Sequence, residues 1–170
     1  MSKHFTILML LLLSTGCQQV NSMSLSFSSY RSTPSLITHF AIEGPLGPIP
    51  PTISSGSADK PIRSRSAGGS ALSAPRDVGK DGVWLVSAQW VELTTDRAWQ
   101  AEIQVPIDDI TIWHNTYIVQ IITGPNGLLL IGADNPGGTD VDVARTCGQR
   151  IPEADKAWRL EVGYFPEMPI

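Results

Sequence analysis

The residue with the clearest chemical role in this sequence is Cys17, which we expect to carry a lipid. It follows the small residues Ser14-Thr15-Gly16, which end an apolar run from Phe5 to Leu13 that begins shortly after Lys3. A short charged segment, an apolar run and small residues are typical of a secretory signal peptide. The run is shorter than the roughly 20 residues that a membrane-spanning helix needs. We therefore predict that residues 1–16 are cleaved and that the Cys17 thiol is lipidated through a thioether.

The stretch before this cysteine resembles the lipobox of bacterial lipoproteins, although Leu13 is one place further from Cys17 than in the commonest form. The resemblance implies three acyl chains, such as palmitate, on the mature N-terminus. Each buried CH2 contributes about 0.8 kcal/mol, so several chains hold a protein on a membrane. Gln18 stands where an aspartate would retain a lipoprotein at the inner membrane. We expect a lipid-anchored protein on the periplasmic face of the outer membrane.

Thiol and imidazole groups are scarce in the rest of the chain. Cys147 is the second of two cysteines, and with Cys17 acylated it has no partner within its own chain. It is then either a buried, inert thiol or half of a disulfide to another chain. We expect His39 to be structural, and His114 would need an acidic or nucleophilic partner in space to act in catalysis.

Acidic clusters give no catalytic or metal-binding pattern. Asp108 and Asp109 would point to opposite faces of a strand, so we interpret them as a turn cap. Asp134-Asn135, together with Asp140 and Asp142, could supply oxygen ligands to Ca2+. Their stretch lacks the pattern of a calcium loop, and an acidic surface loop is the simpler interpretation. The sequence also has no nucleophile elbow, zinc-protease motif or phosphate-binding loop. We therefore predict no catalytic residue, no metal and no cofactor.

Composition bounds the class of partner. Removing residues 1–16 leaves 154 residues, which suits one domain, with eleven basic and sixteen acidic side chains. Residues 17–80 carry a net charge of +3, whereas residues 81–170 carry −8. This acidic half argues against nucleic acid as a ligand. It fits a basic protein partner, although a solvated surface alone would also explain it.

The elements that must position these residues are β-strands. Residues 17–31 are Ser-rich and predict a tether, and Glu43 to Gly79 reads as a long Pro/Gly/Ser-rich loop. Alternating or apolar runs predict strands at Leu36–Ile42, Val83–Leu93, Trp99–Val105, Tyr117–Thr123, Leu128–Ala133 and Trp158–Tyr164. We expect turns at Thr94–Arg97 and Gly124–Gly127, and a short helix at Asp140–Cys147.

These elements predict a mostly β fold, namely a small antiparallel β-sandwich or half-open barrel formed by residues 32–170, with at most one short helix. Five tryptophans, Trp84, Trp90, Trp99, Trp113 and Trp158, lie in or beside these strands. We expect most of them to fill the core. Trp113, which precedes two polar residues, is the best candidate for an exposed anchor.

Residues 40–107 resemble a family of small, uncharacterised bacterial lipoproteins. Four stretches carry the resemblance: Phe40-Ala41-Ile42-Glu43-Gly44, Gly68-Gly69-Ser70, Val86-Ser87-Ala88-Gln89-Trp90 and Ala101-Glu102-Ile103-Gln104-Val105-Pro106. The chain has Ala71-Leu72 where that family often has paired cysteines. Some of these lipoproteins are encoded beside type VI secretion lipase effectors and act as periplasmic immunity proteins. The resemblance therefore implies an immunity protein that inhibits a secreted antibacterial toxin.

Two functions follow as hypotheses. The chain is either such an immunity lipoprotein, binding a basic-surfaced toxin, or a structural or accessory lipoprotein binding another envelope component. For a protein interface we expect contacts from acidic and aromatic side chains on loops, namely Glu92, Asp96, Trp113, Asp134, Asp140 and Asp142.

Overall fold

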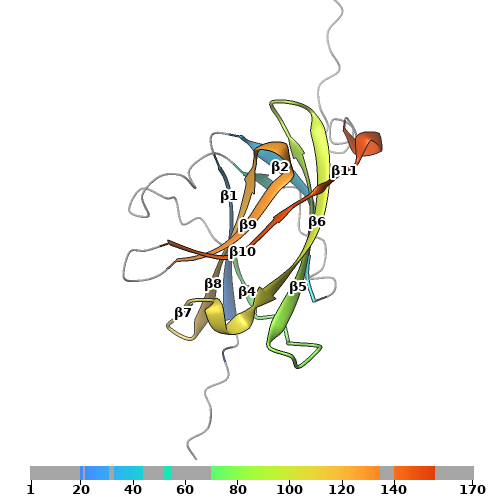
Figure 1. The fold of residues 1–170 in the computed structure, drawn as a ribbon. Helices are drawn as coiled ribbons and strands as arrows, with labels where there is room; N and C mark the ends of the chain where they lie inside the picture. Colours follow the sequence, from blue (N-terminus) through green and yellow to red (C-terminus); the bar gives the residue numbers. More distant parts are fainter. Residues whose placement is uncertain are drawn as a thin grey trace, which may run out of the picture.

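The protein is a β-sandwich, as predicted from its alternating apolar pattern. The computed structural model describes residues 20, 22–30, 33–43, 52–54, 70–134 and 140–155. Two mostly antiparallel sheets face each other in these residues (Figure 1). Short 3-10 turns connect some strands: η2 (Ile107–Asp109), η3 (Pro125–Gly127) and η4 (Pro152–Ala154). In the same residues no helix is long and apolar enough to cross a membrane.

The first sheet has the strand order β10-β9-β8-β1-β4, and β7 pairs with the beginning of β8. Its strands are β1 (Ser22–Ser29), β4 (Ser70–Ser73), β7 (Ile112–Trp113), β8 (Thr116–Gly124), β9 (Leu128–Asp134) and β10 (Asp140–Cys147). Strands β1 and β8 run parallel, and the other neighbours run antiparallel. Residues distant in sequence therefore form the middle of this sheet.

The second sheet is antiparallel throughout, with the order β11-β6-β5-β2-β3. Its strands are β2 (Ser35–Ile42), β3 (Thr52–Ser54), β5 (Val83–Glu92), β6 (Arg97–Pro106) and β11 (Gln149–Arg150). The tight turn between β5 and β6 confirms the prediction at Thr94–Arg97. The turn at η3 between β8 and β9 confirms the other predicted hairpin.

The core lies between the two sheets and follows the period of two expected of strands. Along β5, Trp84, Val86, Ala88 and Trp90 point inward, and Trp99 on β6 joins the same cluster. The first sheet contributes Met23, Leu25, Val119, Ile121, Leu129 and Ile131. The expected core role of these three tryptophans is thus confirmed, whereas Trp158 lies outside the described residues.

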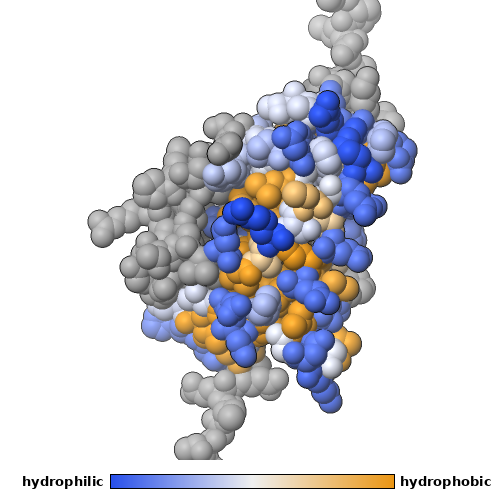
Figure 2. Space-filling view, viewed as in Figure 1, coloured by the Kyte–Doolittle hydropathy of each residue, from blue (hydrophilic) through white to orange (hydrophobic). Residues whose placement is uncertain are grey.

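Strand β10 closes one side of the sandwich. It runs beside β9 in the first sheet and also contacts β6 in the second. Figure 2 shows apolar residues in the middle of this side. The partly buried Ala101, Val143 and Ala144 pack against the core. This stretch is therefore a strand and not the predicted short helix, because Val141 and Val143 alternate with Asp140 and Asp142 at the strand period.

The N-terminal tether is shorter than predicted. Residues 22–29 form β1, which lies between β8 and β4. Its serines alternate with Met23, Leu25 and Phe27, and the first two are buried at 0% and 3% exposure. The high Ser content suggested a flexible tether, but the strict alternation of serine with apolar residues favours a strand. The predicted long loop also contains two short strands, β3 and β4, which form one edge of each sheet.

Candidate binding surface

Four hydrogen-bonding side chains form a row across the outer face of the second sheet. His39 on β2 pairs with Gln89 on β5. Gln89 pairs with Gln100 on β6, which pairs in turn with Gln149 on β11. All four residues are exposed. Since neighbouring strands lie about 4.8 Å apart, this polar row spans about 14 Å.

A β-bulge in β2 brings His39 into the polar row. The register shifts between Ile37 and His39, so that Thr38 is an extra residue on this strand. Ile37 pairs with Trp90 in the core, whereas His39 pairs with Gln89 on the outer face. Because of the bulge, β2 places an apolar residue beside Trp90 in the core and a polar residue beside Gln89 on the outer face. His39 was predicted to be structural, but it is exposed in this row.

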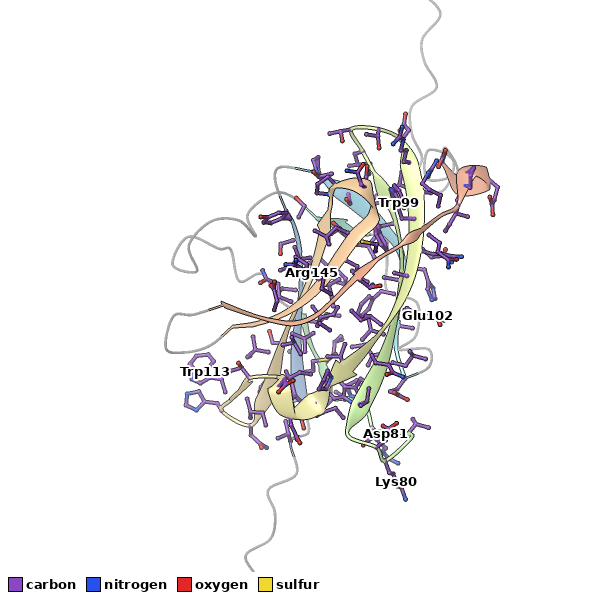
Figure 3. All side chains as sticks on the ribbon, viewed as in Figure 1. Lys80, Asp81, Trp99, Glu102, Trp113 and Arg145 are labelled. Atoms are coloured by element: carbon purple, nitrogen blue, oxygen red, sulfur yellow. The ribbon has the colours of Figure 1, made fainter. Side chains whose placement is uncertain are left out.

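The polar row lies in a groove with a volume of about 580 Å3. The remaining lining residues are Ser87, Ala88, Ala101, Glu102, Thr146 and Cys147. Glu102 is two residues from Gln100 on β6 and therefore shares its face. It is exposed, and Figure 3 shows it directed away from the space between the sheets. We call this feature the amide groove.

Cys147 reaches the amide groove because the chain crosses from the first sheet to the second at Gly148. The N–H of Gly148 donates to the carbonyl of Gly127 at 2.7 Å. A Cβ on Gly148 would lie 2.8 Å from Cη2 of Trp90 and 2.9 Å from the carbonyl oxygen of Gln100. Only glycine permits this approach. Cys147 is an exposed free thiol at this crossing, not a buried one.

Arg150 fixes the end of the groove that carries Gln149. Its guanidinium donates to both carboxylate oxygens of Asp155, each at 2.7 Å. It also donates to the carbonyl of Ala98 and lies 5.1 Å from the ring centroid of Trp99. The hydrogen bonds from Arg150 and then from the Ala98 N–H lower the pKa of Asp155 from 3.8 to about 2. Strand β11 is thereby held against β6.

We expect Asp155 to add an acid-sensitive component to stability. Its folded pKa lies below the ordinary value of 3.8, so its contribution is complete above that pH and is lost as the pH falls through about 2. Thermal unfolding of the wild type and of Asp155→Asn should therefore differ near neutral pH and converge near pH 2. The difference should be small, because the Arg150 and Asp155 side chains are 31% and 28% exposed. An undiminished difference at the acid end would contradict this assignment.

Glu92 is not the exposed contact residue that the sequence predicts. It is 2% exposed. Its Oε1 accepts a hydrogen bond from the N–H of Gly127 at 3.0 Å, and its Oε2 accepts one from Oγ1 of Thr95 at 2.8 Å. Glu92 thus joins the β5–β6 turn to η3. Its position at the end of a strand gave no sign of this partner in a turn 35 residues away.

The other predicted acidic contacts do not gather into one site. Asp96 is half-buried in the β5–β6 turn, with a φ of 54°. Asp142 is exposed on a strand rather than a loop, and forms an ion pair of 2.9 Å with Arg145. Asp134 and Asp140 are opposite each other in β9 and β10, but their side chains lie outside the described residues. The predicted acidic loop between them does as well.

Trp113 is exposed, as expected, with 58% of its surface accessible. It belongs to the first sheet and does not line the amide groove. Cys17 lies outside the described residues. In the part of the chain that is described, no three His, Cys, Asp or Glu side chains could hold a metal ion together. The groove residues Gln89, Gln100, Glu102 and Gln149 were not singled out from the sequence.

No family model matches the chain, and no curated protein or solved structure matches it. A functional assignment therefore depends on the chain's own features. These are the amide groove, the charge distribution and the N-terminal cysteine motif.

Proposed function

We propose that this protein is a lipid-anchored periplasmic lipoprotein that binds another protein through the amide groove. Its most specific form is an immunity protein that neutralises a secreted antibacterial toxin of the type VI lipase-effector class. The observation that carries the proposal is the polar row, in which four strands present hydrogen-bonding side chains at matched positions.

The groove suits an extended polar segment of a partner. A glutamine amide offers both donors and an acceptor, and His39 adds another donor or acceptor. Side chains repeated at the strand spacing over about 14 Å can pair with several groups along such a segment. Glu102 lies beside the row on the same face. Its carboxylate favours a lysine or arginine within the bound segment.

The charge of the chain supports a basic partner. Residues 81–170, which supply every groove residue except His39, carry a net charge of −8. Complementary charge steers the encounter between two proteins and excludes like-charged competitors. The lipid expected on Cys17 would keep this surface in the periplasm, where a toxin delivered from another cell must act. The resemblance to lipoproteins encoded beside lipase effectors supports the same class of partner.

Binding measurements on matched groove variants test this proposal. The purified protein from residue 17 onward is titrated with the secreted protein encoded by the adjacent gene. We expect Gln100→Arg to weaken binding at least tenfold, because it inserts a large cation into the middle of the polar row and removes an interface group. Gln104→Arg is the control, since Gln104 is exposed on the same strand but lies outside the groove. Equal effects of the two variants, or no binding by the wild type, would reject the proposal.

An accessory envelope lipoprotein that binds peptidoglycan is the second candidate. Amide and hydroxyl side chains in a groove can also pair with glycan hydroxyl groups. Co-sedimentation with purified sacculi distinguishes the two functions. Sedimentation of the wild type, but not of Gln100→Arg, would favour the accessory function over the immunity function.

A further inference from the structure

Exposed large apolar side chains are concentrated at one end of the sandwich. Among the described residues they are Val78, Leu85, Ile112 and Trp113, with exposures of 68%, 45%, 50% and 58%. Val78 precedes β5, Leu85 is near its start, and the other two form β7. We call these four residues the apolar end. Figure 3 shows Trp113 in the lower part of the view, the same part that contains Lys80 and Asp81 of the β4–β5 loop.

The apolar end is also the end at which the described chain begins its first strand. Ser22 pairs with Thr116 beside β7. Its Oγ donates to the carbonyl of Asn115 at 3.1 Å and lies 2.7 Å from Oγ1 of Thr116. Cys17 precedes Ser22 by five residues. Since a chain extends at most about 3.6 Å per residue, five residues span at most about 18 Å from Ser22.

The β7–β8 hairpin presents Trp113 on a rigid turn. His114 and Asn115 have φ values of 46° and 61°. Two consecutive positive φ values are those of the type I′ turn that matches the twist of a two-residue hairpin. The Trp113 ring packs against His114 with centroids 4.7 Å apart. The exposed indole is therefore held in place, and tryptophan is the side chain that prefers the boundary between lipid and water.

We propose that the apolar end rests on the lipid surface that holds the acylated Cys17, with Trp113 at the level of the headgroups. The inference rests on the lipid anchor of the proposed function. It adds a fixed orientation to that anchor. The lipid on Cys17 tethers the chain to the membrane, and contact of the apolar end with the lipid surface aligns the domain. A protein partner is less favoured at this end, since Cys17 holds the end close to the membrane.

The orientation leaves the amide groove open to the periplasm. Gln89 follows Leu85 by four residues on β5, which corresponds to about 13 Å along a strand. The groove therefore lies above the headgroups, at about this distance from the apolar end. The exposed Asp81, Asp108 and Asp109 near the apolar end outnumber the exposed Arg76 and Lys80 of the β4–β5 loop. We therefore expect contact with zwitterionic lipid that anionic lipid does not strengthen.

Fluorescence quenching by lipid tests the proposal on the full acylated protein. The protein is inserted into phosphatidylcholine vesicles that contain a nitroxide-labelled phosphatidylcholine. We expect quenching in the wild type that is lost in Trp113→Phe. A second protein, Gln100→Trp in the Trp113→Phe background, controls for distance, because its added indole lies in the groove and should escape quenching.

Flotation of the same samples separates the two proposals. Acylated protein that floats with the vesicles but shows equal quenching with and without Trp113 would overturn the orientation and leave the anchor intact. Protein that does not float would overturn the anchor and the orientation together. Quenching of the indole at position 100 to the same extent as Trp113 would show an unaligned domain, and would also reject the inference.

Discussion

Replacing Trp90 by alanine is expected to lower the free energy of unfolding by about 3–5 kcal/mol, the usual cost of removing a buried tryptophan. Trp90 is 0% exposed and pairs with Ile37 on one side and Trp99 on the other. Its ring also fills the space beneath Gly148, where a Cβ would be only 2.8 Å away.

Thermal and urea unfolding measure this effect. For a chain of this size each kcal/mol shifts the melting temperature by about 2–4 °C, so we expect a decrease of roughly 10 °C. Trp113→Ala is a matched control, because it removes the same side chain from the surface and should change stability by less than about 0.5 kcal/mol. Comparable losses in the two variants would contradict the assignment of Trp90 to the core.

The strands with a clear alternation were predictable from sequence alone. Trp99–Val105 alternates apolar and polar residues, and it lies within β6. The turn at Gly124–Gly127 was also predictable, because Asn126 and Gly127 adopt the positive φ values that such residues allow. These features are local, so a short window of sequence contains the information that specifies them.

Features that depend on pairing between distant strands were not predictable. Strand β1 pairs in parallel with β8, about 94 residues away, and no local pattern predicts that partner. The amide groove has the same origin. Gln89 and Gln100 are ordinary exposed residues in sequence, and only the register of four strands, with a bulge at Thr38, aligns them with His39. Glu92 was misassigned because its partner, the Gly127 N–H, belongs to the η3 turn that joins two strands of the other sheet.

Replacing Cys17 by serine is expected to remove the protein from the membrane completely. Serine lacks the thiol that would hold the lipid through a thioether, and the resemblance to lipoproteins implies that all the acyl chains depend on this first step. Each lost CH2 removes about 0.8 kcal/mol of membrane affinity, whereas a single chain binds with only about 10⁴ M⁻¹. The four side chains of the apolar end cannot replace several acyl chains. We therefore expect Cys17→Ser in the soluble periplasmic fraction and without incorporated palmitate.

Cys147→Ser is the matched control for this experiment, because it removes the other cysteine and leaves the expected lipid site intact. It should stay in the membrane fraction and incorporate palmitate like the wild type. Label retained in Cys17→Ser but lost in Cys147→Ser would instead identify Cys147, whose thiol is exposed, as the acylated residue. Under the proposed function, purified Cys17→Ser should still bind the toxin with wild-type affinity, because the amide groove is unchanged. Cells that produce it should nevertheless be less protected, since the binding surface is no longer held at the membrane where a lipase effector would act.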